Sequence, residues 1–140
     1  MRLFLDTDVL VDVAIDRQPY SETAARLLDR IQKSHASSLA AYVSWNSFLE
    51  FSQAATPLVG NHKTAEFCSE LCGFVKIANV RADDLKSALA FQLAEFRATL
   101  QAAAAIACAA DLIVTSRAQA FNGLRIPIQS PGAALESLGL

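Results

Sequence analysis

Residues 3–10 have the sequence Leu-Phe-Leu-Asp-Thr-Asp-Val-Leu, in which three apolar residues run into a charged one. A short apolar run followed by residues that favour helix N-caps is typical of a buried strand leading into a helix. Thr7 and Asp8 are the candidate caps, and apolar residues then recur at helical spacing as far as Ala14. The segment therefore predicts a strand whose carboxyl end carries Asp6 to one edge of a sheet.

Short apolar runs and amphipathic segments alternate along the rest of the chain. Further strands are expected over residues 39–43, 75–80, 112–114 and 124–128, the last at an edge because it contains Pro127. Helices are expected over residues 21–31, from Ser44 to a break at Thr56-Pro57, and over residues 61–72, 82–90 and 95–110. This alternation predicts a three-layer α/β/α fold, with a mainly parallel sheet of about five strands covered by helices on both faces.

Length and composition limit the class of protein. The 140 residues fit one domain spanning 1–140, and 53% hydrophobic against 19% charged residues excludes a disordered chain. The formal net charge of −2 provides no global basic field, so RNA contact would require a local patch. The early carboxylate of Asp6 excludes a signal peptide, and no apolar run approaches a membrane span. We therefore expect a cytoplasmic protein with no membrane partner.

The cysteines and glycines narrow the choice further. Cys68, Cys72 and Cys108 are odd in number and form no CxxC pair, which favours buried thiols over a metal site or a disulfide framework. The five glycines are scattered and form no phosphate-binding loop. Their distribution argues against a nucleotide-binding doubly wound domain.

Several motifs occur in an order that resembles the PIN-domain family. The apolar strand ending at Asp6 resembles the opening of these domains, and residues 44–50 resemble their helix with an inward glutamate. Residues 100–104 resemble a later alanine-rich helix, and residues 110–115 followed by Phe121 resemble the strand after it. Residues 126–128 and Pro131 match the usual tail, so the resemblance covers almost the whole chain. It implies a PIN-like (Rossmann-like) fold and a homodimer, and Trp45 and Phe48 are candidate core or dimer contacts.

The resemblance implies a metal-dependent ribonuclease site. Carboxylates suit Mg²⁺ or Mn²⁺, which would polarise a scissile phosphate and help to generate a hydroxide nucleophile. Carried over by position, Asp6 and Glu50 are the expected metal-binding acids, and Thr115 is a supporting hydroxyl.

Two of the four acids that the family implies are replaced in this chain. Ala98 stands at the position of the third acid and Arg117 at that of the fourth, which predicts weak or lost nuclease activity. Glu95, three residues before Ala98, or an inward-turned Asp8 could instead complete an active Mg²⁺- or Mn²⁺-dependent endoribonuclease. The opposite hypothesis is that Arg117 takes the place of the metal by pairing with Asp6 and Glu50.

These alternatives lead to two function hypotheses. Small single-domain PIN proteins resemble the VapC-like toxins of toxin–antitoxin pairs, which cleave RNA and are inhibited by an antitoxin partner. In the other hypothesis the chain keeps the fold but binds RNA or a protein partner without catalysis. Because similar folds carry different functions, the geometry of the site has to distinguish the two.

Overall fold

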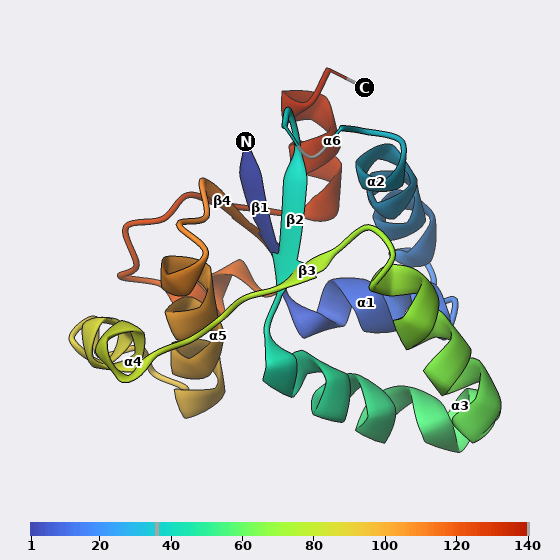
Figure 1. Ribbon diagram of the computed structural model, residues 1–140, viewed down its shortest axis with the longest axis horizontal. Coiled ribbons are helices and arrows are strands. Elements are labelled where there is room, and N and C mark those ends of the chain that lie inside the picture. Colours follow the sequence, from blue (N-terminus) through green and yellow to red (C-terminus); the bar gives the residue numbers. More distant parts are fainter. Residues whose placement is uncertain (36, 140) are drawn as a thin grey trace.

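The computed structural model describes residues 1–35 and 37–139 and shows one five-stranded sheet (Figure 1). All its strand pairs are parallel, and the strand order is β3-β2-β1-β4-β5. The strands are β1 (Arg2–Leu5), β2 (Ala40–Val43), β3 (Lys76–Ile77), β4 (Leu112–Val114) and β5 (Ile128–Gln129). The predicted α/β fold with a parallel sheet of five strands is confirmed.

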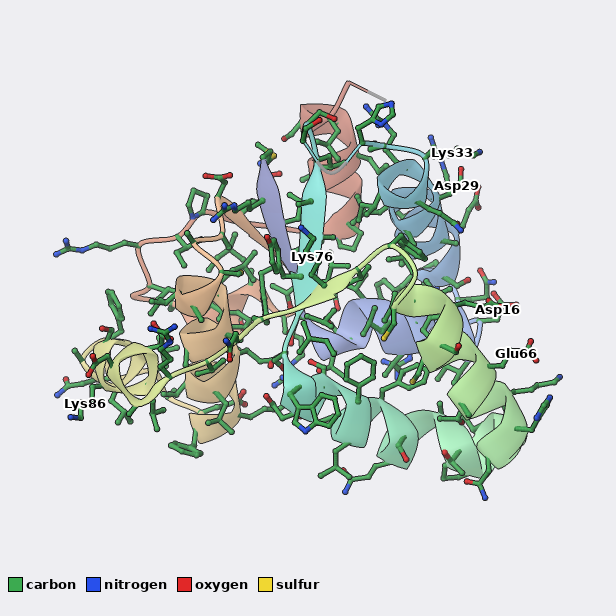
Figure 2. All side chains as sticks on the ribbon, in the orientation of Figure 1. Asp16, Asp29, Lys33, Glu66, Lys76 and Lys86 are labelled. Carbon is green, nitrogen blue, oxygen red and sulfur yellow. The ribbon has the colours of Figure 1, made fainter. Side chains whose placement is uncertain are left out.

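Helices cover both faces of this sheet, which gives the predicted three layers (Figure 1). They are α1 (Thr7–Ala14), α2 (Ser21–Gln32), α3 (Trp45–Leu71), α4 (Ala82–Leu89), α5 (Phe96–Ala107), the 3₁₀ turn η1 (Ala118–Phe121) and α6 (Pro131–Ser137). In Figure 1, α4 and α5 lie on one side of the central strands, and α1, α2, α3 and α6 lie on the other. Charged side chains such as Asp29, Lys33 and Lys86 project from the outer surfaces of the helices (Figure 2).

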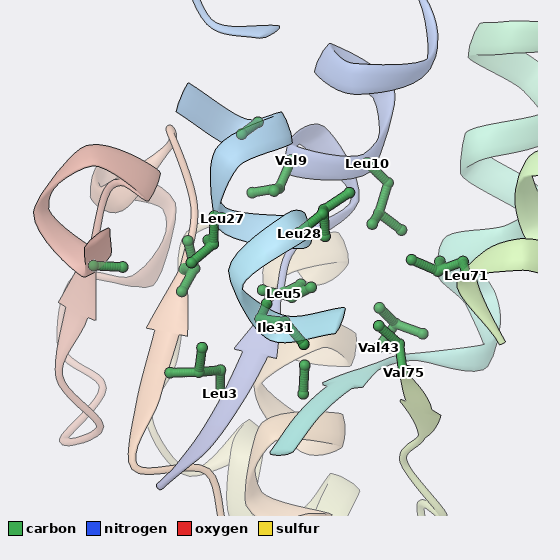
Figure 3. Close-up of a cluster of buried hydrophobic side chains, with 14 of the residues drawn as sticks. Leu3, Leu5, Val9, Leu10, Leu27, Leu28, Ile31, Val43, Leu71 and Val75 are labelled. Atoms are coloured by element: carbon green, nitrogen blue, oxygen red, sulfur yellow. The ribbon is translucent and has the colours of Figure 1, made fainter. Parts of the chain in front are cut away.

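The central strand β1 divides the hydrophobic core into two parts. Leu3 and Leu5 pack with α1, α2 and α3, whereas Phe4 between them packs with α5. This follows from the two-residue period of a strand, which turns successive side chains to opposite faces. Figure 3 shows the first part, where Leu27 and Ile31 of α2 lie against the strands. The buried β1 fixes the position of Asp6, the residue that directly follows it.

The helix break predicted at Pro57 lies three residues later, so that prediction is wrong. α3 continues through Pro57 and kinks at Gly60, whose φ of 87° and ψ of 166° are not helical. Proline only removes one hydrogen-bond donor here, whereas the combination of φ 87° with ψ 166° is open almost only to a residue without a Cβ atom. The Thr64 hydroxyl donates to the Gly60 carbonyl oxygen at 2.8 Å and closes the kink. α3 therefore consists of two limbs joined at Gly60.

Other element bounds also differ from the prediction. β3 is shorter than the predicted residues 75–80. β5 begins only at Ile128, because Pro127 has no N–H to donate to the sheet. The Pro127 carbonyl oxygen still accepts from the Ile113 N–H at 2.9 Å. α5 ends at Ala107, since Ala109 adopts a φ of 52°. α6 was not predicted; its N-cap is Ser130, whose hydroxyl accepts from the Ala133 N–H at 3.1 Å.

The cysteines are more varied in exposure than predicted. All three are free thiols, but only Cys108 is buried, whereas Cys68 is half-buried and Cys72 is exposed. The difference arises because Cys72 lies at the C-cap of α3, where the chain turns at the surface. Burial raises the pKa of the Cys108 thiol to about 11, so this thiol is unreactive at neutral pH.

No helix in residues 1–35 and 37–139 combines the length and the apolar character needed to cross a lipid bilayer.

Candidate functional site

Asp6 lies at the carboxyl end of β1 and is fully buried. Its backbone N–H continues the sheet by donating to the Val114 carbonyl oxygen at 3.0 Å. Its side chain is the N-cap of α1, where Oδ1 accepts from the Thr7 N–H at 2.9 Å. Thr7 and Asp8, predicted as caps, are instead the first two residues of the helix. The strand-to-helix junction thus holds a buried carboxylate in a fixed orientation.

A buried polar network surrounds this carboxylate. Gln101 of α5 donates from Nε2 to Asp6 Oδ1 at 2.8 Å, and Thr115 donates from its hydroxyl to Asp6 Oδ2 at 2.8 Å. On its other side, Gln101 Oε1 accepts from the Ser44 hydroxyl at 2.5 Å. Ser44 is also the N-cap of α3, as predicted, and accepts from the Ser47 N–H. The network joins α1, α3, α5 and β4 at one edge of the sheet.

The cation at the centre of the site is Arg97, from the first turn of α5. Its Nε donates to Glu50 Oε2, and its Nη2 lies 3.5 Å from Asp6 Oδ1. Glu50 also accepts at Oε1 from the Thr7 hydroxyl, at 2.9 Å. The side chains of Arg97 and Glu50 are 29% and 27% exposed, so both are largely desolvated. One guanidinium therefore contacts both acids that the sequence placed in the site.

Two effects act on the charge of Arg97. Burial lowers its pKa, but the charge of Asp6 and the charge and hydrogen bond of Glu50 outweigh burial. The pKa of Arg97 therefore lies above its ordinary value, and the group remains a cation at every accessible pH.

The predicted pairing of Arg117 with Asp6 and Glu50 is wrong. Arg117 Nη2 instead donates to both carboxylate oxygens of Glu95, at 3.0 and 3.2 Å. This pair is exposed, and it joins the loop after β4 to the start of α5. Arg117 is held there because its backbone N–H donates to the Thr115 hydroxyl at 3.0 Å.

Glu95 does not reach the acid cluster, so the hypothesis that it completes the site is wrong for this arrangement. It is the N-cap residue of α5, with extended backbone angles (φ −114°, ψ 129°), and is not a helical residue. Glu95 therefore does not share a helix face with Ala98, although it lies three positions before it. Glu95 serves as the partner of Arg117 at the surface.

Asp8 does turn toward the site. Its Oδ2 accepts from the Ser116 N–H at 2.9 Å, from the Ser116 hydroxyl and from the Thr115 hydroxyl at 3.4 Å. Its Oδ1 is buried and finds no hydrogen-bond partner among the described residues. Burial and then the charge of Asp6 raise the pKa of Asp8, and the hydrogen bonds from Ser116 oppose this rise only in part. Asp8 is thus a partly buried carboxyl group with one free oxygen.

The position of the third expected acid holds only a methyl group. Ala98 is fully buried and belongs to a hydrophobic cluster with Phe4, Ile113 and Phe121. A carboxylate there would have to be desolvated beside aromatic rings, so the surroundings of Ala98 have adapted to an apolar side chain.

Comparison with known proteins decides the family. A family model described as PIN domain matches residues 2–116, which include Asp6, Glu50 and Thr115. The chain belongs to the PIN-domain family. No curated protein matches it.

Two solved structures share the fold of this PIN domain at low sequence identity. One is a chain of the crystal structure of VapBC2 from Rickettsia felis bound to a DNA fragment from their promoter. The match has a TM-score of 0.72 and 14% sequence identity, and it covers 93% of the present chain and 98% of that chain. The other is Mycobacterium tuberculosis VapC20, described as a sarcin-ricin loop cleaving toxin, with a TM-score of 0.62 and 15% identity over 79% and 86% of the two chains. The fold is therefore that of VapC-like PIN domains.

The acids of this PIN domain do not fit a divalent cation as they are arranged. Within residues 1–35 and 37–139, no three His, Cys, Asp or Glu side chains are grouped so that they could hold a metal ion. Asp6 accepts hydrogen bonds on both oxygens, and Glu50 is held by Arg97 and Thr7. The carboxylate oxygens of Asp6 and Glu50, which Mg²⁺ or Mn²⁺ would require, thus accept hydrogen bonds from the protein's own donors.

An open pocket of about 470 Å³ gives solvent access to this cluster. Its charged lining residues are Asp8, Glu50, Arg17, Arg97 and Arg117. Since Arg17 Nε lies 3.4 Å from Asp12 and Arg117 binds Glu95, the two arginines at the rim have acidic partners of their own. Arg97 is the lining arginine that contacts Asp6 and Glu50.

Sequence reasoning missed Arg97 and Gln101, although a signal was present. The two residues are four apart in an alanine-rich helix, so they form a polar stripe on one face. A buried polar stripe on a helix that faces Asp6 requires polar partners.

Proposed function

We propose that this protein is a VapC-like PIN-domain protein that has lost metal-dependent RNA cleavage and acts by binding. The observation that carries the proposal is the Arg97 guanidinium, which lies against Glu50 and within 3.5 Å of Asp6. Ala98 and Arg117, at the positions of the other two family acids, support it because neither can contribute a carboxylate.

Electrostatics explains why this arrangement disfavours a metal. Mg²⁺ and Mn²⁺ bind through carboxylates and water, and they would have to enter a site that already contains a permanent positive charge. The charge of Asp6 and Glu50 that would attract the metal is offset in part by the single positive charge of Arg97. A divalent cation would therefore have to displace Arg97 from Glu50 and Asp6 before it could use their oxygens.

One observation favours the alternative of an active Mg²⁺- or Mn²⁺-dependent endoribonuclease. Asp8 faces the same pocket as Glu50, and its Oδ1 has no partner among the described residues. In this alternative Asp8 would complete a metal site with Asp6 and Glu50, while Thr115 would support it as a hydroxyl. Glu95 would contribute only if it left Arg117.

The proposal predicts that the wild-type protein neither binds Mn²⁺ nor cleaves RNA in a metal-dependent manner. Calorimetric titration of Mn²⁺ into metal-free protein should give no specific heat, and structured RNA should remain intact with either Mn²⁺ or Mg²⁺. Asp8→Asn is the informative variant. Cleavage by the wild type that disappears in Asp8→Asn would overturn the proposal and support the active alternative.

For the partner, we propose an antitoxin-type protein and, as a second ligand, RNA. One fold neighbour is described as VapBC2 bound to promoter DNA, and the other as a toxin that cleaves the sarcin-ricin loop. A toxin-type protein without hydrolysis could still bind its antitoxin, because that requires surface complementarity and not a metal. A neighbouring gene that encodes a small DNA-binding protein, and its co-purification with this chain, would support the proposal; a partner-free operon would weigh against it.

We also propose that the chain forms a homodimer through an apolar surface at the start of α3. Trp45 is 72% exposed and Leu49, four residues later on the same helix, is 63% exposed. The exposed Trp45 lines an apolar pocket of about 550 Å³ together with Ile77, Val80 and Leu85. Large exposed apolar surfaces of this kind are typical of interfaces.

Trp45→Ala is accordingly expected to weaken the dimer by roughly 30-fold or more, the effect typical of an aromatic residue at the centre of an interface. Leu58→Ala is the matched control, because Leu58 is also exposed on α3 (68%) but does not line this pocket. Analytical ultracentrifugation over a concentration series measures both. A monomeric wild type, or equal effects of the two variants, would contradict the proposed interface.

A further inference from the structure

Arg117 lies where two open pockets meet. It lines the pocket of about 470 Å³ that gives access to the acid cluster, and it also lines a neighbouring pocket of about 650 Å³. The second pocket is otherwise formed by Ala94 and Glu95, which precede α5, and by residues 116–120, most of which are small. A chain molecule that contacts the Arg117 side chain would therefore find open space on both sides of it.

The guanidinium of Arg117 has unused hydrogen-bonding capacity. Its side chain is 45% exposed, and Nη2 donates to both carboxylate oxygens of Glu95, at 3.0 and 3.2 Å. Within residues 1–35 and 37–139, Nε and Nη1 of Arg117 donate no hydrogen bond. A guanidinium presents its donors in a planar fork that matches the oxygens of a phosphate group. The free donors of Arg117 therefore suit an anion of this kind.

The pocket that Arg117 shares with the acid cluster is lined by more cations than acids. The cations are Arg17, Arg97 and Arg117, and the acids are Asp8 and Glu50. Both acids already accept hydrogen bonds from the protein's own donors. The lining of this pocket thus favours an anion over a cation.

Two further acids lie behind this lining. Asp6 and Asp12 are buried, and each has an arginine nearby: Arg97 lies 3.5 Å from Asp6, and Arg17 lies 3.4 Å from Asp12. These two arginines are therefore committed to buried acids. Arg117, whose own acidic partner is exposed, is the cation that can exchange its partner for a ligand.

This exchange costs little. The Glu95 side chain is 47% exposed, and it makes no capping hydrogen bond to α5. An exposed ion pair contributes little to stability, because both groups are well solvated when they separate. A phosphate group that displaces Glu95 gains charge-assisted hydrogen bonds from Arg117. The Glu95 carboxylate thus competes with an anion for the same donors.

We propose that Arg117 is the receptor for a phosphate group at the junction of the two pockets, and that Glu95 is its built-in competitor. The phosphate group belongs to an RNA backbone or is free phosphate, and the open space on both sides of Arg117 favours the RNA chain. The proposal rests on the proposed function, because it names how a protein without cleavage activity would hold RNA. It gives a role to the arginine at a family acid position, since a carboxylate there would repel phosphate.

Fluorescence anisotropy with a labelled single-stranded RNA, in the presence of EDTA, tests the receptor. Arg117→Ala is expected to weaken RNA binding at least about tenfold, the effect of losing hydrogen bonds to a charged group. It should also reduce the slope of log K against log salt by about 0.7, which corresponds to one phosphate contact. Arg125→Ala is the matched control, because Arg125 is exposed and lines neither pocket. Equal weakening by both variants would overturn the proposal, since it would indicate a general charge effect.

Glu95→Gln tests the competitor and should act in the opposite direction. It removes the charge that holds Arg117, so RNA binding is expected to become about two- to fivefold tighter. Glu66→Gln is the matched control, because Glu66 is exposed and lies 3.5 Å from a basic side chain, that of His62, but lines neither pocket. Unchanged binding by Glu95→Gln, or equal tightening by Glu66→Gln, would contradict the role given to Glu95.

Inorganic phosphate distinguishes the two sources of the phosphate group. Loss of RNA binding in Arg117→Ala identifies the RNA backbone as the ligand. If the protein binds no RNA, but inorganic phosphate raises the melting temperature of the wild type and not of Arg117→Ala, the ligand is free phosphate. If neither RNA nor phosphate binding depends on Arg117, the proposal is overturned and the proposed loss of cleavage still stands. Metal-dependent cleavage of RNA by the wild type would instead contradict the proposed function.

Discussion

Asp6→Ala is expected to lower the free energy of unfolding by about 3–5 kcal/mol, the cost of breaking a buried ion pair from one side. The variant leaves Arg97 without one of its two acidic partners, and it leaves Gln101 Nε2 and the Thr115 hydroxyl without their 2.8 Å acceptor. It also removes the N-cap of α1. Each of these losses acts in the same direction.

The expected loss of stability is opposite in sign to the effect of removing one of several carboxylates that repel one another. Where acids repel one another in the absence of metal, removal of one relieves the repulsion. Here Arg97 lies within 3.5 Å of Asp6. The loss of Asp6 therefore removes this attraction together with the hydrogen bonds of Asp6, and we expect these losses to outweigh the relief of its repulsion with Asp8. Urea denaturation measures the difference, and Asp29→Ala serves as the control. Asp29 of α2 forms an exposed 2.8 Å pair with Lys33, the C-cap residue of this helix (Figure 2), and its loss should cost no more than about 1 kcal/mol. An unchanged or increased stability of Asp6→Ala would show that Arg97 is not the counter-ion of Asp6.

Gln101→Leu is expected to destabilise the fold by about 2–4 kcal/mol, although leucine fills a similar volume. Gln101 is fully buried, and its amide satisfies Asp6 Oδ1 on one side and the Ser44 hydroxyl on the other. Leucine would leave both groups buried with one bond fewer. The loss arises from the polar partners and not from a cavity, so it depends on Asp6.

Gln53→Leu provides the matched control for this substitution. Gln53 lies on α3 at the same pocket but is exposed, and the same chemical change there should alter the free energy of unfolding by about 0.5 kcal/mol or less. A double-mutant cycle of Gln101→Leu with Ser44→Ala isolates the shared hydrogen bond. Equal effects at positions 101 and 53, or strict additivity with Ser44→Ala, would contradict the role given to Gln101.

The architecture of the protein could be predicted from its sequence because local patterns determine it. The apolar runs at residues 3–5 and 112–114 can only be buried in a sheet, and the helical periods between them require crossovers that make the strands parallel. Asp6 was placed correctly at a carboxyl strand end for the same reason. Where one local rule competes with another, as with Pro57 and Gly60, the position of the break could not be predicted.

The partners of the acids depend on distances between elements that no local pattern encodes. Arg97 and Arg117 both line the same pocket. From the sequence we predicted Arg117 as the partner of the acids, because it stands at the position of a family acid. In the structure Arg117 pairs with Glu95, whereas Arg97 pairs with the acid cluster. That choice depends on where α5 begins, because a start at Phe96 makes Glu95 an extended cap residue and turns Arg97 toward Glu50. Periodicity and residue type alone thus establish the sheet, the helices and Asp6 at the strand end. The cation that neutralises Asp6 is set by the packing of α5 against β1 and α3, since ion pairing requires atoms within a few ångströms of one another across the fold.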